Sequence, residues 1–322
     1  MSKRVLVFLW LLACATLAWA GEPPADLTRH FEYDRNAPLD LQIISRDERD
    51  DAIVYDLTYL SPKGGRVPAY LVVPRGKGRF AAILFGHWAM PGSPTRNRSE
   101  FLPEALAYAR AGAVSLLIDA PFARPGQSED PDFLSEKNAE MLLQQVLDMR
   151  RGVDLLLARD DVDPDHLGFV GHSYDAAAGG ILAGVEKRIA TLVLMAGGLA
   201  EEEMLLTSDE PAIAEWRQRV GEERIKAYLA KYGWLDPVHY IRHAAPAAVL
   251  LQYARKDEFV KNPDAWAQRD FKWVSEPKEL ELYDAGHALD AQARRDRYQW
   301  LRIHLRLGEL DPAALDAIPQ VK

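Results

Sequence analysis

The chain has 322 residues, of which 48% are hydrophobic and 27% are charged, and its formal net charge is −9. This composition indicates a globular protein with a sizeable core, built as one large α/β domain or two small ones. The acidic balance, with no cluster of Lys and Arg interleaved with aromatic side chains, argues against a nucleic-acid-binding protein.

The first twenty residues have the pattern of a signal peptide. Lys3 and Arg4 precede an apolar run over 5–17 that is too short to span a bilayer comfortably, and an Ala-Trp-Ala cleavage site ends at Ala20. We therefore expect cleavage after Ala20 and export to the periplasm or the medium. The alternative is lipoprotein processing at Cys14, the only cysteine, because the preceding residues loosely resemble a lipobox.

Residues 21–50 are polar and interrupted by prolines, so we expect an exposed lead-in to a domain over 51–322. Short apolar runs then alternate with longer helical patterns. The predicted strands are 67–74, 80–88, 113–121, 166–173, 188–198, 247–257 and 278–287. The predicted helices are 99–112, 136–159, 175–184 and 288–307.

Several of the predicted strands are continuous apolar runs, which indicates burial on both faces. The chain is therefore predicted to be α/β, with a doubly wound, mostly parallel sheet and helices on both faces. The acidic, helical stretch 199–245 is too long for a plain connection. We expect it to form a helical, cap-like insertion before the penultimate strand.

The stretch LGFVGHSYDAAAGG, over 167–180, joins a predicted strand to a predicted helix through a Gly-x-Ser turn. In such a turn the serine hydroxyl stands clear of the sheet, and backbone N–H groups at the helix start can hold an oxyanion. Ser173 is thus a candidate nucleophile, and the alternative is that it only caps the helix. His172, next to it, should point to the other side.

A serine nucleophile needs an imidazole to take its proton and an acid to orient that imidazole. His287 follows the last predicted strand, and Asp257 follows the strand before it, so that Ser, Asp and His come in this order at successive strand ends. The second candidate for the acid is the run of Glu201, Glu202 and Glu203. Asp284 lies within the strand that leads to His287 and should be structural.

Two further regions could complete an active site. The turn FGHW follows an early strand, and we expect the backbone N–H of Trp88 to bind the oxyanion together with that of Tyr174, with the Trp88 indole lining the substrate pocket. Arg124 could bind a substrate carboxylate, although pairing with a protein carboxylate is the favoured alternative.

The chain resembles the α/β-hydrolases, in the branch of the dienelactone hydrolases and prolyl-oligopeptidase-like enzymes that includes bacterial acetyl xylan esterases. The resemblance runs from about 67 to 307 and is carried by ILFGHW, LIDAPFARPG, LGFVGHSYDAA, LDPVHYIRHAAPAAVLLQYARKDEFV and YDAGHAL. It implies that Ser173, Asp257 and His287 form a catalytic triad and that Trp88 and Tyr174 provide the oxyanion hole. Asp175 departs from the family pattern, which has Gly or Ala at this position.

The resulting expectation is an exported serine hydrolase that cleaves a small-molecule carboxylic ester through an acyl-enzyme. The alternatives are a peptidase or amidase, because the same triad serves amides, and a binding protein with a degenerate site. We expect no cofactor, because the sequence has no phosphate-binding glycine loop and no HExxH motif. His239 and His243 have helical spacing, but no third metal ligand is evident.

Overall fold

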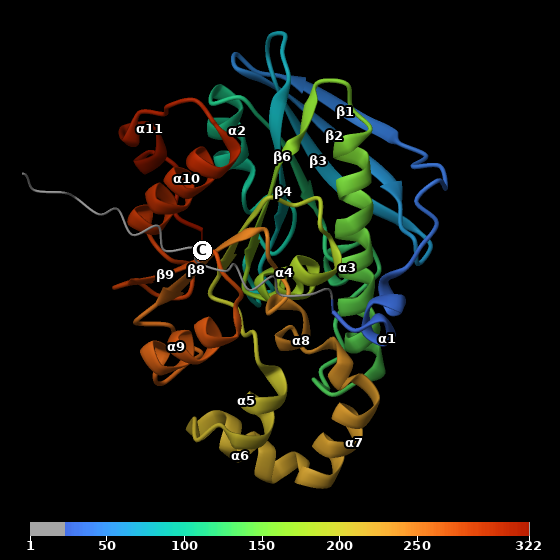
Figure 1. Cartoon of the computed structure of the whole chain (residues 1–322), viewed down its shortest axis with the longest axis vertical. Coiled ribbons are helices and arrows are strands. Elements are labelled where there is room, and N and C mark those ends of the chain that lie inside the picture. Colours follow the sequence, from blue (N-terminus) through green and yellow to red (C-terminus); the bar gives the residue numbers. More distant parts are fainter. Residues whose placement is uncertain (1–22, 322) are drawn as a thin grey trace, which may run out of the picture.

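The computed structural model describes residues 23–321, and in this part of the chain a nine-stranded sheet forms the centre of the molecule (Figure 1). The strand order is β1-β2-β3-β5-β4-β6-β7-β8-β9. Strands β1, β2, β3 and β5 pair antiparallel, and the strands from β5 to β9 are parallel. The strands are β1 (Gln42–Glu48), β2 (Ala52–Leu60), β3 (Arg66–Pro74), β4 (Phe80–Gly86), β5 (Ala113–Ile118), β6 (Val162–His172), β7 (Thr191–Met195), β8 (Ala248–Ala254) and β9 (Lys278–Tyr283).

Helices cover both faces of the sheet and form two hydrophobic cores. One core contains side chains of α3, α4, α8 and α9, and the other contains side chains of α2, α10 and α11. The helices are α1 (Ala25–Thr28), α2 (Leu102–Arg110), α3 (Glu136–Leu157), α4 (Tyr174–Val185), α5 (Glu201–Thr207), α6 (Pro211–Val220), α7 (Glu222–Tyr232), α8 (Val238–Ile241), α9 (Pro263–Trp273), α10 (Ala291–Leu305) and α11 (Pro312–Asp316).

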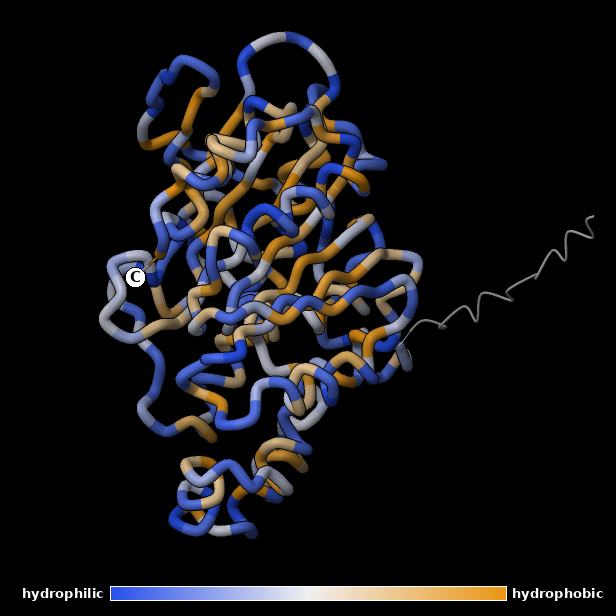
Figure 2. The backbone as a smooth tube through the Cα atoms, turned by 90° about the vertical axis from the view of Figure 1, so that its left-hand side faces the viewer, coloured by the Kyte–Doolittle hydropathy of each residue, from blue (hydrophilic) through white to orange (hydrophobic). Residues whose placement is uncertain are grey.

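The central strands are buried along their whole length. Every residue of β5, β7 and β8 is buried, and the sheet is the hydrophobic centre of the molecule in Figure 2. Burial on both faces explains why these strands are continuous apolar runs in the sequence. The predicted doubly wound, mostly parallel sheet with helices on both faces is confirmed.

The insertion before the penultimate strand β8 is helical, as predicted. Helices α5, α6 and α7 form a lobe at the lower end of the molecule in Figure 1, beyond the start of α4. Strands β6, β7, β8 and β9 are parallel, so their carboxyl ends lie at the same edge of the sheet. The insertion follows β7 at this edge, so that the strand ends and the insertion face the same space.

The structure contains more elements than the sequence predicted. Strands β1 and β2 were missed, and so was helix α9. The predicted lead-in over 21–50 contains β1, whose side chains are all exposed, but also Phe31, which is fully buried against the core. The expected cleavage site at Ala20 and the alternative at Cys14 lie outside the described residues.

No helix within residues 23–321 has both the length and the apolar character needed to cross a membrane.

Candidate functional site

Ser173 occupies a strained turn between β6 and α4. Its φ and ψ are 53° and −107°, in the left-handed half of conformational space that non-glycine residues rarely adopt. Its backbone N–H donates to the carbonyl oxygen of Met195 at 2.7 Å, which fixes the turn to β7. Gly171 must be glycine, since a Cβ there would lie 2.3 Å from the carbonyl oxygen of Asp175. The turn thus holds the hydroxyl out from the sheet.

The structure brings together the three residues that the sequence singled out. Nε2 of His287 is 2.9 Å from Oγ of Ser173, and Nδ1 of His287 is 2.8 Å from Oδ2 of Asp257. The carboxylate accepts Nδ1–H, which leaves Nε2 to accept the hydroxyl proton. Both His287 and Asp257 are buried, with 6% and 9% of their surfaces exposed.

The loop carrying Asp257 also has a fixed conformation. Oδ1 of Asp257 accepts the backbone N–H of Phe259 at 3.0 Å, and the carboxylate of Glu258 accepts the backbone N–H of His287 at 3.1 Å. The loop that carries Asp257 and the loop that carries His287 are therefore held together by a hydrogen bond. The rival acids lie elsewhere: Asp284 pairs with Lys256 on the surface, and the run 201–203 belongs to α5 in the insertion.

Two cavities meet at Ser173. The first, of about 410 Å³, contains the side chains of His287 and Asp257 and is otherwise mainly apolar. The second, of about 310 Å³, extends from Ser173 along α3 and α4 toward the insertion and does not include His287. Residues that line both cavities are Phe133, Ser173, Ala196, Gly197, Gly198, Met204 and Trp266.

The structure contradicts the predicted roles of Trp88. Its backbone N–H donates to Oε2 of Glu100 at 2.7 Å, so this N–H is not available to an oxyanion. Its indole is 1% exposed and lines neither cavity at Ser173. Ala89 and Met90, the next residues of the same turn, line the first cavity instead.

Tyr174 is the first residue of α4, directly after the candidate nucleophile. The first N–H groups of a helix have no partner within the helix, so the N–H of Tyr174 is suited to bind an anion beside Ser173. Its side chain lines the second cavity.

A second histidine–carboxylate pair lies behind His287. Nδ1 of His172 is 2.5 Å from Oε1 of Glu100, and Nε2 of His172 donates to the backbone carbonyl of His287 at 3.0 Å. The Trp88 ring stacks on His172 at 5.0 Å and lies parallel to His287 at 6.5 Å. This buried network holds the backbone of the His287 loop through the hydrogen bond from His172. Sequence reasoning missed it, because Trp88 and Glu100 lie 12 residues apart in the connection between β4 and α2, and His172 ends β6.

Arg124 does not reach the cavities at Ser173. It is buried, donates to Oδ2 of Asp148 on α3 at 2.5 Å and also bonds the backbone carbonyl of Asp119. The predicted substrate-binding role is therefore wrong, and the alternative of a protein carboxylate partner holds. A buried arginine needs such a partner, because burying an unpaired charge is costly.

The residues described by the structure contain no group of three or more His, Cys, Asp or Glu side chains that could hold a metal ion. His239 lies on the short helix α8, and His243 lies just beyond its end.

No protein-family model matches the chain, and no curated protein is similar to it in sequence. Solved structures are similar. Acetyl xylan esterase 1 from Thermoanaerobacterium sp. JW/SL YS485 has 18% identity and a TM-score of 0.68, over 87% of this chain and 94% of that chain.

Two further structures widen the comparison. An alpha/beta hydrolase from Penicillium sp. sh18 has 16% identity and a TM-score of 0.55, over 82% of this chain and all (100%) of that chain. A prolyl endopeptidase has 18% identity and a TM-score of 0.58, over 80% of this chain and 39% of that chain. The chain has the α/β-hydrolase fold. The resemblance noted in the sequence is confirmed at the level of the fold.

Asp175, the residue that departs from the α/β-hydrolase pattern, is fully buried, with 0% of its surface exposed. Its carboxyl group accepts hydrogen bonds from Nε2 of Gln145, at 2.9 and 3.0 Å, and from the backbone N–H of His87. Burial raises the pKa of Asp175 well above its ordinary value, and the charge of Glu100 raises it further. The carboxyl therefore faces the interior of the α/β-hydrolase fold and lines neither cavity at Ser173.

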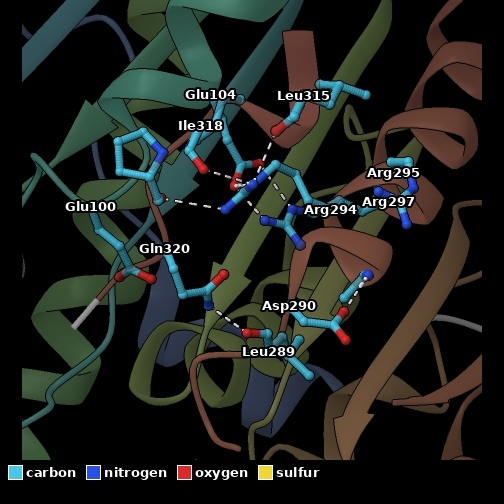
Figure 3. Close-up of polar contacts among 12 residues, drawn as sticks. Glu100, Glu104, Leu289, Asp290, Arg294, Arg295, Arg297, Leu315, Ile318 and Gln320 are labelled. Atoms are coloured by element: carbon cyan, nitrogen blue, oxygen red, sulfur yellow. Dashed lines mark hydrogen bonds and ion pairs between the residues drawn. The ribbon is translucent and has the colours of Figure 1, made fainter. Parts of the chain in front are cut away.

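The C-terminal segment holds the loop that follows His287 in this α/β-hydrolase fold (Figure 3). Nε2 of Gln320 donates to the carbonyl oxygens of Ala288, at 3.2 Å, and of Leu289. Arg294 of α10 donates to the carbonyls of Leu315 and Ile318 at 3.0 Å, which fixes the segment in place. The position of His287 thus depends on contacts far along the chain.

Proposed function

We propose that this protein is a serine hydrolase that cleaves carboxylic esters through an acyl-enzyme. The observation that carries the proposal is the hydrogen-bonded series from Ser173 through His287 to Asp257 at the junction of two cavities. Each residue lies within the distance that proton transfer requires.

In the first half of the reaction, Oγ of Ser173 bonds to the ester carbonyl carbon while its proton moves to Nε2 of His287. The carbonyl oxygen becomes an oxyanion, which the backbone N–H of Tyr174 stabilises together with a donor from the turn that carries Ala89 and Met90. When the oxyanion collapses, the bond from carbon to the alcohol oxygen breaks. The proton on Nε2 then passes to the leaving oxygen.

In the second half, a water molecule attacks the acyl carbon and gives its proton to Nε2 of His287. Ser173 Oγ leaves, takes this proton back, and the carboxylic acid is released. Throughout, the Asp257 carboxylate keeps Nδ1 protonated and stabilises the positive charge that the imidazole carries in each transition state.

The same residues could act on amides, and the fold occurs both in acetyl xylan esterases and in a prolyl endopeptidase. The test is labelling by a fluorophosphonate probe, which should require Ser173, followed by rates on p-nitrophenyl acetate and on peptide anilides. Ester hydrolysis that Ser173→Ala abolishes supports the proposal. Faster anilide hydrolysis would make the protein an amidase, and absence of both labelling and turnover would indicate a binding protein.

We further propose that the protein is exported and loses its first 20 residues. The pattern of Lys3, Arg4, the apolar run and the Ala-Trp-Ala site supports this proposal. Mass spectrometry of the exported protein should show Gly21 as the first residue. A lipidated Cys14 at the N-terminus would contradict it and indicate a membrane-anchored protein.

A further inference from the structure

The two cavities that meet at Ser173 differ in which half of an ester they can hold. In the proposed reaction Nε2 of His287 must reach the leaving oxygen, so the alcohol lies on the side of His287. His287 lines the first cavity and not the second. The second cavity is therefore the space that remains for the acyl chain of the ester.

The second cavity is larger than an acetyl group requires. Its volume of about 310 Å³ is at the lower end of the range for ligand pockets. Apolar side chains of Met141, Leu142 and Met204 form much of its wall. An acyl chain of several carbons can therefore be buried there with a gain from the hydrophobic effect.

One carboxyl group in this cavity is not engaged with a protein cation. Glu201, at the start of α5, lines the cavity and is partly buried, and no Lys, Arg or His within residues 23–321 forms an ion pair with it. Burial, followed by the nearby charge of Asp236, raises the pKa of Glu201 to about 7. Burial, followed by the nearby charge of Glu201, raises the pKa of Tyr228, which also lines this cavity.

The other carboxyl group of the cavity and its one side-chain amide already have partners. Glu129 pairs with Arg96, and the Asn138 amide donates to the carbonyls of Asp130 and Asp132. Glu201 is thus the carboxyl group that is free to accept a hydrogen bond from a ligand. A carboxyl group placed in an apolar cavity beside a nucleophile is typical of substrate recognition.

We propose that the second cavity holds the acyl chain of the substrate and that Glu201 binds a hydroxyl or ammonium group carried on that chain. This inference rests on the proposed ester hydrolase function. It names a substrate class, esters of hydroxy- or amino-substituted carboxylic acids, and it predicts that esters of dicarboxylic acids are poor substrates because Glu201 would repel their free carboxylate.

The test is a matrix of p-nitrophenyl esters with butanoyl, hexanoyl and octanoyl chains, each unsubstituted or with a terminal hydroxyl, ammonium or carboxylate group. The measured quantity is kcat/KM relative to the unsubstituted ester of the same length. At about pH 8, above the pKa of Glu201, the carboxyl is ionised. At one chain length or more, the wild type should then prefer the hydroxyl or ammonium ester by about tenfold, the effect of a hydrogen bond to a charged group. The carboxylate ester should be the slowest.

Two glutamates of α5 give a matched pair of variants. Glu201→Leu should reduce the preference to within about twofold of unity, since leucine has a similar size but neither accepts a hydrogen bond nor carries a charge. Glu203→Leu should retain the wild-type preference, because Glu203 is exposed and lies outside the second cavity. Labelling of Ser173 by the fluorophosphonate probe shows that Glu201→Leu is folded.

A preference that survives in Glu201→Leu, or no preference at any chain length, would overturn the inference while leaving the ester hydrolase proposal intact. If the wild type hydrolyses none of the esters in a Ser173-dependent way, the proposed function fails, and this inference fails with it.

Discussion

The side chain of Asp175 fills the space that any Cβ on Gly86 would need. A Cβ built on Gly86 would lie 2.6 Å from both Cβ and Oδ2 of Asp175. Gly86 ends β4, and Asp175 lies in the first turn of α4, where the resemblance to the α/β-hydrolases implies Gly or Ala. The glycine at 86 and the aspartate at 175 therefore depend on each other for packing.

This relationship predicts strong coupling between the two positions. Gly86→Ala should destabilise the protein by about 1–3 kcal/mol, the typical effect of overpacking. Asp175→Gly should also be destabilising, because it leaves the Gln145 amide without its buried acceptor. In the double variant the Gly86→Ala penalty should largely disappear, which urea unfolding of all four proteins would reveal. Additive effects would contradict the packing argument.

Asp175→Gly also tests whether Asp175 takes part in catalysis. Since the carboxyl lines neither cavity, the variant should keep a kcat equal to or higher than that of the wild type. Loss of turnover in a folded Asp175→Gly protein would make Asp175 a participant in catalysis.

The buried carboxyl of Asp175 should make stability depend on pH. Its pKa is raised in the folded protein, so folding favours the protonated form, and this contribution is fully present below the ordinary pKa of about 4. As pH rises from there through the folded pKa, the charge must be buried and stability is lost. Asp175→Asn has no such charge, so its melting temperature relative to wild type should increase with pH. A difference that stays constant from acid to neutral pH would contradict this.

Ser173 and His287 should behave as one unit in kinetics. Ser173→Ala and His287→Ala should each remove most of the kcat, and the double variant should be little worse than either, because effects within a catalytic unit are not additive. Asp257→Asn should lower kcat strongly, whereas Glu202→Gln should not. If Glu202→Gln lowered kcat strongly and Asp257→Asn did not, the assignment of Asp257 as the acid would be wrong.

Glu100 should act as a positioning residue for His287. Glu100→Ala removes the partner of His172 and of the Trp88 N–H, so the His287 carbonyl loses its fixed support. We expect kcat to fall about 10- to 100-fold, the effect of small misplacement of a catalytic group, with little change in KM. Glu100→Gln should recover part of the loss, since it can still accept the Trp88 N–H. A fall in thermal stability with unchanged kcat would show a purely structural role.

The sequence predicted those parts of the molecule whose signals are local. The buried strands β5, β7 and β8 are continuous apolar runs, and the strand-to-helix turn at Ser173 is visible as Gly-x-Ser. Strand β1 gave no such signal, because all its side chains are exposed and it is held by pairing with β2.

The errors at the site share a different cause. Trp88 was expected to bind the oxyanion because it follows a strand, but its N–H donates to Glu100, which lies 12 residues later in the same connection between β4 and α2. Arg124 was considered for substrate binding because its loop follows a strand, but a buried carboxylate of α3 binds it. Partners that are distant in the sequence decide such roles, and spacing alone does not identify them.

The triad residues follow strands of the sheet, whereas part of the cavity wall comes from the insertion, and this separation has an evolutionary consequence. Ser173, Asp257 and His287 follow strands β6, β8 and β9, while Glu201 and Met204 come from α5, a segment between β7 and β8. Substitutions in 199–245 can reshape the substrate cavities without moving any group that transfers a proton. Natural variants of this chain that differ in that segment should therefore diverge in the esters they accept while sharing the same chemistry, and exchanging the segment between two of them should exchange their substrate preference.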